Sequence, residues 1–124
     1  MDSIYQEVIL HHYKYPKNFG HIHKPTHASH KNNPLCGDDI SIEIGAENGT
    51  VVRVGFTGSG CALATASASI LMEHIKGMRL NDVASLTSEN LLALIGVSPS
   101  PSRLKCALLP LEVLHSTLSH PLTQ

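Results

Sequence analysis

Hydrophobic and polar residues alternate along residues 39–59, in two runs that flank the dipeptide Asn48-Gly49. Alternation with a period of two is typical of a β-strand with one buried face, because successive side chains point to opposite sides. Asn-Gly is the strongest short hairpin signal, since both central residues of such a turn take positive φ angles. The pattern therefore predicts a β-hairpin whose buried face carries Ile40, Ile42, Ile44, Val52, Val54 and Phe56.

Apolar residues at helical spacing predict helices on both sides of this hairpin. The segment "DSIYQEVILHHY" predicts a short helix that ends before Pro16. After the hairpin, "CALATASASILMEHIKG" predicts a helix opened by Ser59 or Gly60 and closed by Gly77. Its first half consists of small side chains, which let a helix lie close to a sheet.

Three further helices are expected towards the end of the chain. Two are short, over residues 80–86 and 88–95, and the second begins at "TSE" in the manner of a capping box. The last, "SRLKCALLPLEVLHSTL", has Ser102 as a candidate N-cap. Pro110 lies inside it and is expected to kink the helix or delay its regular part, because proline removes a backbone donor.

Residues 15–34 show neither period and are rich in Pro, Gly, His, Asn and Lys, which predicts a flexible loop. A chain of 124 residues is expected to form a single domain, with a helix and loop over residues 1–34 and a core over residues 35–124. Internal repeats and linkers are absent from the sequence.

Charge and composition narrow the function classes. Nine Lys and Arg against 10 Asp and Glu give no broad cationic face, so a nucleic-acid partner is not expected. The start lacks the basic and apolar regions of a signal peptide, and no segment has the length of a membrane span. These features predict a cytoplasmic protein without a membrane partner.

The three cysteines stand out because each is expected at a junction between elements. Cys36 precedes the first strand, Cys61 lies where the hairpin meets a helix, and Cys106 lies in the first turns of the last helix. An odd number of cysteines does not make a disulfide framework. At a helix start, free N–H groups and the macrodipole favour thiolate, the form that binds metal or attacks sulfur.

Asp38 follows Cys36 by two residues and can therefore point to the same side of an extended chain, whereas Asp39 points to the opposite side. Three sulfurs and one carboxylate suit a tetrahedral zinc site or one face of an iron-sulfur cluster. The chain has no CxxC pair, so every ligand would come from a different element.

Plainer interpretations exist for several of these residues. A single buried cysteine is most often an inert packing residue. The histidines of the N-terminal region could form a second metal site, but their irregular spacing in a polar loop favours solvated side chains; they are His11, His12, His21, His23, His27 and His30. His74 and His115 are expected to pack or cap within helices.

Four segments, in matching order over nearly the whole chain, resemble the IscU/SufU/NifU-type iron-sulfur cluster assembly scaffolds. They are "YQEVILHHYKYPKNFG", "NPLCGDDI", "GSGCALATASASILME" and "RLKCALLPLEVL". The resemblance implies an α+β fold, with a small antiparallel sheet of about three strands packed against several helices. It also implies an exposed site made of Cys36, Asp38, Cys61 and Cys106.

The same resemblance implies a function and partners. Members of the family receive sulfur from a PLP-dependent cysteine desulfurase, assemble a [2Fe-2S] cluster and pass it to apo-proteins, and many are isolated with zinc. In this chain Cys106 or Cys36 would accept the persulfide sulfur. The chain would then be a scaffold or sulfur acceptor rather than a turnover enzyme.

The chain departs from each branch of the family. ISC-type members have a histidine before the last cysteine and an "LPPVK" motif; this chain has Lys105 and "SPSPSRLKC", which argues against a dedicated Hsp70 chaperone partner. "RLKC" resembles the SUF-type branch, in which Arg103 would contact the desulfurase together with Lys105. The insertion usual in that branch is missing, however.

Three functional hypotheses therefore stay open. The first is a [2Fe-2S] assembly scaffold. The second is a zinc-dependent sulfur acceptor that activates its desulfurase and holds no cluster, which "RLKC" favours. The third is a structural zinc domain that unfolds when metal is removed. A Cys/His hydrolase fits poorly, because no histidine is paired with a cysteine in a motif.

Overall fold

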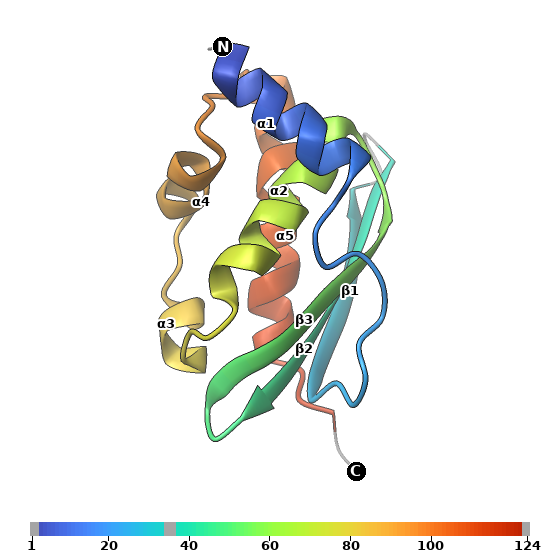
Figure 1. Ribbon diagram of the computed structural model, residues 1–124, viewed down its shortest axis with the longest axis vertical. Coiled ribbons are helices and arrows are strands. Elements are labelled where there is room, and N and C mark those ends of the chain that lie inside the picture. Colours follow the sequence, from blue (N-terminus) through green and yellow to red (C-terminus); the bar gives the residue numbers. More distant parts are fainter. Residues whose placement is uncertain (1–2, 34–36, 123–124) are drawn as a thin grey trace.

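A computed structural model describes residues 3–33 and 37–122 of the chain (Figure 1). The elements follow in the order α1 (Ser3–Lys14), β1 (His27–Asn33), β2 (Asp38–Glu47), β3 (Thr50–Ser59), α2 (Ala62–Ile75), α3 (Leu80–Ala84), α4 (Ser88–Ile95) and α5 (Pro101–Leu118). The three strands form one antiparallel sheet in the order β1-β2-β3. This is the α+β architecture expected from the resemblance.

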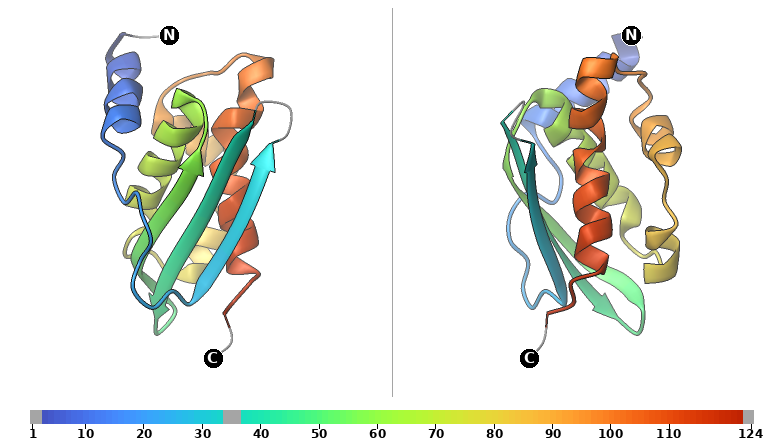
Figure 2. Two further views of the ribbon diagram at one scale, coloured as in Figure 1. Left: turned by 90° about the vertical axis from the view of Figure 1, so that its right-hand side faces the viewer. Right: turned by 180° about the vertical axis from the view of Figure 1, so that it is seen from behind.

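Helices α2 and α5 cover one face of the sheet, and α3 and α4 lie on the side of these helices that faces away from it (Figures 1 and 2). The core lies between the sheet and the two covering helices. Its largest fully buried side chains include Phe56, Ile40, Ile42, Ile44, Leu71, Met72 and Leu114. The small residues of α2 are buried as well, with Ala64, Ala66 and Ala68 at 0% exposure, so the helix lies close against its neighbours.

The predicted hairpin is confirmed, with one correction on its second strand. Asn48 and Gly49 have φ angles of 54° and 77°, as the tight turn requires. The register shifts between Gly45 and Ala46, and Val52 has no partner in the ladder. Because this bulge reverses the alternation, Val51 is fully buried and Val52 is 44% exposed, so the expected burial of Val52 was wrong.

The prediction of a loop over residues 15–34 was wrong for its last part, because residues 27–33 form β1. This strand pairs along its length with β2, from His27 opposite Ile44 to Asn33 opposite Asp38. Its sequence, "HASHKNN", carries no alternating pattern since it is an edge strand with much of its surface exposed. Pairing with β2 therefore determines its conformation, rather than its own side chains.

The helix boundaries differ from expectation at two starts. Helix α2 is capped by Cys61 itself, not by Ser59 or Gly60. Helix α5 begins at Pro101 with Ser100 as its N-cap, not at Ser102, because proline is favoured at the first helical position. The same helix continues through the buried Pro110 to Leu118, so proline does not delay it.

Candidate metal centre

The structure brings three of the four predicted ligands together. One ligand atom from each of Asp38, Cys61 and Cys106 lies within 4.8 Å of the others. The residues come from the first position of β2, the N-cap of α2 and the second turn of α5. Cys36, the fourth predicted ligand, lies outside the described residues. This is the one such cluster of His, Cys, Asp or Glu in the described part of the chain.

Asp38 is oriented by a contact with the start of α2. It is 1% exposed, and its Oδ1 accepts a hydrogen bond of 2.8 Å from the backbone N–H of Cys61. Its second oxygen, Oδ2, lies 3.9 Å from the Sγ atom of Cys61. Asp39 is only partly buried and pairs with His30 instead, so the two neighbouring carboxylates face opposite sides of the sheet, as alternation predicts.

Gly58, near the end of β3, allows this strand to pass close to the start of β2. Its φ angle of +133° is one that other residues rarely adopt, and a β-carbon there would lie 1.9 Å from the carbonyl oxygen of Asp39. The last residues of β3 therefore lie against the start of β2, which places Cys61 beside Asp38.

Cys61 serves as the N-cap of α2 as well as a candidate ligand. Its Sγ atom accepts a hydrogen bond from the backbone N–H of Ala64 at 3.4 Å. Sulfur is a weak acceptor compared with the hydroxyl and carboxylate oxygens that usually cap helices. The thiol is partly exposed, so it is the most accessible of the three clustered ligands.

Cys106 lies deeper than the sequence suggested. It is the sixth residue of α5 and is 6% exposed. Only the first four N–H groups of an α-helix lack an acceptor within the helix. The expectation that Cys106 meets free N–H groups was therefore wrong, because the helix begins earlier than predicted. The site was also expected to be exposed; Asp38 and Cys106 are buried, whereas Cys61 is partly exposed.

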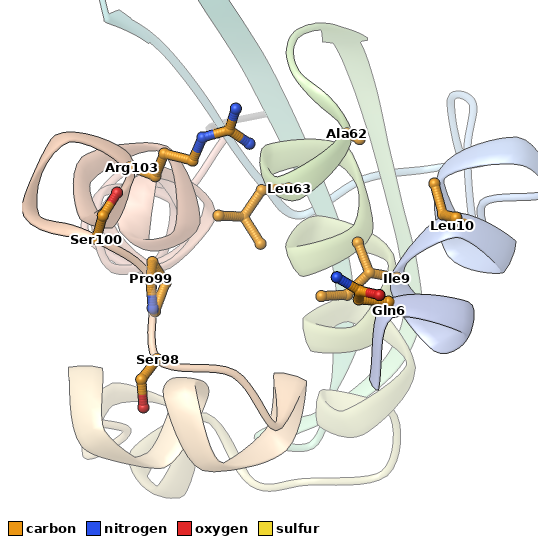
Figure 3. A pocket seen from close by; sticks show the side chains of 9 residues that line it. All are labelled: Gln6, Ile9, Leu10, Ala62, Leu63, Ser98, Pro99, Ser100 and Arg103. Carbon is orange, nitrogen blue, oxygen red and sulfur yellow. The ribbon is translucent and has the colours of Figure 1, made fainter. Parts of the chain in front are cut away.

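Arg103 and Lys105, the predicted partner contacts, are exposed on two different sides of α5. Arg103 lines a groove of about 650 Å³ between α1, the start of α2 and the segment before α5. Figure 3 shows Arg103 and Leu63 both extending into the space between α5 and α2. Ile9 and Leu10, from α1, lie on the other side of α2. Lys105 lines a smaller hollow of about 280 Å³ together with Asn32, Asn33, Leu109 and Glu112.

The histidines of the N-terminal region are spread over several separate contacts. His21 pairs with Glu43 at 3.2 Å, and the Nδ1 atom of His12 lies 2.7 Å from the hydroxyl of Ser69. Burial, followed by the positive charges of Lys17 and His11, lowers the pKa of His12. Among the described residues, the cluster of possible metal ligands includes none of these histidines.

Sequence reasoning missed two features of the site. Gly60 was interpreted only as an opening residue of the helix, although a β-carbon at this position would lie 2.8 Å from Oδ1 of Asp38. The groove beside Arg103 was not anticipated either, because it forms between α1 and two segments far along the chain. The two glycines in "GSG" were the available signal for the first, since paired glycines often mark close backbone approach.

Comparison with known proteins decides the family. The sequence model of one protein family, the NifU-like N terminal domain, matches residues 4–121 of this chain. The chain belongs to this family. Among its relatives, the zinc-dependent sulfurtransferase SufU of Bacillus subtilis is 32% identical over 131 residues, covering 92% of this chain and 88% of that protein. The iron-sulfur cluster assembly scaffold protein IscU of Aquifex aeolicus is 33% identical over 117 residues, covering 93% and 74%.

Solved structures share the fold of this NifU-like domain. A candidate iron-sulfur cluster assembly scaffold protein for the SUF system from Fervidobacterium islandicum superimposes with a TM-score of 0.76 at 26% identity, covering 94% of this chain and 97% of that one. The N-terminal part of a NifU-like protein from Brucella abortus reaches the same TM-score at 18% identity, which shows the fold alone.

The donor set of this NifU-like domain fits a thiophilic metal. Tetrahedral zinc with sulfur and oxygen ligands needs neighbouring donor atoms about 3.5–3.8 Å apart. The separation of 3.9 Å between the Cys61 sulfur and Oδ2 of Asp38 is close to this, and all three donors lie within 4.8 Å of one another. Zinc or iron could therefore bind here with small side-chain movements.

No helix in residues 3–33 and 37–122 is long and apolar enough to cross a membrane.

Proposed function

We propose that the protein is an iron-sulfur cluster assembly scaffold that accepts sulfur from a cysteine desulfurase, binds iron and builds a [2Fe-2S] cluster for transfer to apo-proteins. The convergence of Asp38, Cys61 and Cys106 from three separate elements is the observation that carries this proposal. The IscU relatives, whose names describe assembly scaffolds, support it. Cys36 completes the proposed ligand set as the fourth residue.

Sulfur would arrive by exchange between cysteines. The thiolate of Cys106 or Cys36 attacks the terminal sulfur of the desulfurase persulfide, the S–S bond breaks, and the desulfurase cysteine leaves as a thiolate. This transfer needs no oxidant or reductant. Incorporation of the sulfur as sulfide then takes two electrons for each atom, which a thiol reductant supplies in the assay. Peptide mass spectrometry of the persulfidated protein identifies which of the two cysteines gains the sulfur, and a mass gain on Cys61 alone would contradict both choices.

Asp38 would act as the weaker ligand that releases cargo. A carboxylate is a harder donor than thiolate and binds soft metal sites less firmly. Replacing Asp38 with Ala removes this exchangeable ligand, so the variant should retain its cluster and transfer it to an apo-ferredoxin more slowly than wild type. Asp39→Ala is the matched control, because that carboxylate lies on the other face of the strand. Equal transfer rates for wild type and Asp38→Ala would contradict this role.

The desulfurase would dock over the end of the molecule where Arg103 and Lys105 project from the first turns of α5. Both cations are exposed, and the groove beside Arg103 adjoins Ala62 and Leu63, next to Cys61. An acidic or apolar segment of the enzyme could therefore approach the site there. The departures in "SPSPSRLKC" give no support for a dedicated Hsp70 chaperone as a further partner.

A second candidate function is a zinc-dependent sulfur acceptor that activates the desulfurase without holding a cluster. The 32% identity to the zinc-dependent sulfurtransferase SufU favours it, as does the sequence "RLKC". In that case Cys36, Asp38, Cys61 and Cys106 would hold zinc, a Lewis acid that would keep the cysteines as thiolates.

One reconstitution separates the two functions. The purified protein is incubated anaerobically with ferrous iron, cysteine, a thiol reductant and a cysteine desulfurase, and its visible absorption and zinc content are followed. Charge-transfer bands between thiolate and iron, lost when any one of the three cysteines is replaced by Ser, support the scaffold. Retained zinc, no chromophore and faster cysteine turnover by the desulfurase support the sulfur acceptor. If the protein binds neither metal nor cluster and leaves the desulfurase unchanged, both proposals fail.

A further inference from the structure

The buried carboxylate of the site occupies the place where a side chain at Gly60 would begin. A β-carbon at this position would lie 2.8 Å from Oδ1 of Asp38, 3.3 Å from its Cγ and 3.4 Å from its Cβ. Oδ1 is also the oxygen that accepts the Cys61 N–H bond at 2.8 Å. The space that the missing side chain leaves is therefore filled by the carboxylate itself.

The reason for glycine here is space rather than backbone conformation. Unlike Gly58, Gly60 has no φ angle in the left-handed region, so alanine can adopt its backbone conformation. Asp38 is 1% exposed, so its carboxylate cannot turn away without disturbing packed neighbours. The three atoms nearest to a methyl group at this position would all belong to Asp38.

We propose that Gly60 is a positioning residue for the metal centre, because its lack of a side chain sets the orientation in which Asp38 presents Oδ2 beside the Cys61 sulfur. The inference rests on the proposed metal-binding function. It assigns to the second glycine of "GSGC" a role in ligand geometry, in addition to the cysteine that follows.

Metal binding to Gly60→Ala gives the main test. We expect its zinc affinity, measured by competition with a chromophoric chelator, to fall roughly 10–100-fold, the range seen when a group that orients a ligand is lost. With cobalt in place of zinc, the visible ligand-field bands should move to those of Asp38→Ala, although the carboxylate is still present. In the Asp38→Ala background, Gly60→Ala should have little further effect, since the groups act through one another.

Gly45→Ala is the matched control. A β-carbon at Gly45 would lie 2.6 Å from the guanidinium of Arg53, so this variant introduces a similar clash with a charged side chain elsewhere in the sheet. It should leave the zinc affinity and the cobalt spectrum unchanged. A Gly60→Ala protein with wild-type zinc affinity and cobalt bands would overturn the inference, as would an equal change in Gly45→Ala.

The metal-free protein gives a second readout that does not depend on the proposed function. The backbone N–H resonance of Cys61 reports its hydrogen bond to Oδ1, and Gly60→Ala should shift it in the same direction as Asp38→Ala. An unshifted resonance overturns the inference even if the protein binds no metal, whereas failure of wild type to bind zinc or cobalt counts against the proposed function alone. If Gly60→Ala does not fold, restored folding in Gly60→Ala with Asp38→Ala supports the inference, and continued unfolding overturns it.

Discussion

Helices α2 and α4 begin with the same pair of interactions but take their partners from different places. In α4, Thr87 Oγ1 accepts the N–H of Asn90 at 3.2 Å, and the Asn90 side chain accepts the N–H of Thr87 at 2.9 Å. In α2, the Cys61 sulfur accepts the N–H of Ala64 at 3.4 Å. The N–H of Cys61 donates a hydrogen bond to the carboxylate of Asp38, which belongs to a strand more than 20 residues earlier.

The difference separates a cap that serves stability from one that also serves chemistry. The α4 cap is complete within four residues, so it forms with the helix itself. The α2 cap uses a weaker acceptor and a distant carboxylate, and both groups are candidate metal ligands. A metal held in the proposed site would therefore use side chains that also cap α2, whereas the α4 cap contains none of the candidate ligands.

The largest expected effect comes from Cys61→Ser. Serine is a better N-cap than cysteine, so the free energy of unfolding of the metal-free protein should stay equal or rise slightly. Zinc affinity should nevertheless fall by more than the roughly 10–100-fold that accompanies loss of a supporting group, because a soft ligand is removed outright. Urea unfolding and chelator competition on the same preparation test both parts. Lower stability together with unchanged zinc affinity would refute the shared use of this cap.

The converse variant is Thr87→Ala in α4. Loss of the cap should lower the free energy of unfolding by about 1 kcal/mol, within the range of 0.5–2 kcal/mol for such substitutions. Zinc affinity should stay within about twofold of wild type, since the cap lies outside the site; this limit corresponds to roughly 0.4 kcal/mol. Ser88→Ala is a suitable control, because Ser88 follows the cap and makes no capping bond. A marked loss of zinc affinity in Thr87→Ala would show that the two helix starts are coupled.

The smallest effect concerns a contact between a titratable residue of α1 and a serine of α2. His12 contacts the hydroxyl of Ser69, and burial together with Lys17 and His11 lowers its pKa in the folded protein. The folded state therefore binds fewer protons than the unfolded chain, so stability is present above the ordinary value near 6.5 and is lost as the pH falls below it. From about pH 7.5 to about pH 5.5, His12→Gln should reduce the loss of unfolding free energy by less than about 1 kcal/mol.

His74, an exposed residue of α2, provides the control for this measurement. His74→Gln should leave the pH dependence of unfolding close to that of wild type. If both variants change it equally, the effect belongs to overall charge rather than to the contact between α1 and α2.

Local patterns predicted much of this molecule because their signals lie within a few residues. Alternation separated Asp38 from Asp39, Asn48-Gly49 marked the turn, and "TSE" marked the start of α4. The convergence of Asp38, Cys61 and Cys106 was expected from the family resemblance and from the position of each cysteine at a junction.

Features that depend on partners elsewhere in the chain escaped prediction. Strand β1 is polar and becomes a strand only through β2, and the bulge opposite Gly45 moves burial from Val52 to Val51. The start of α5 was misplaced because "SPSPS" offers three serines as candidate caps, of which Ser100, directly before Pro101, is the cap. Gly60 acts on a carboxylate from another strand, which no local pattern records.

The wide spacing of the ligands along the chain has a consequence for biosynthesis. Asp38 and Cys61 emerge from the ribosome well before Cys106, because synthesis and folding proceed from the N-terminus. A nascent chain therefore offers an incomplete set of donors, and its affinity for metal stays low until α5 has been made and docked. Under the proposed function, loading with iron or zinc would mark a polypeptide whose translation has passed its last cysteine.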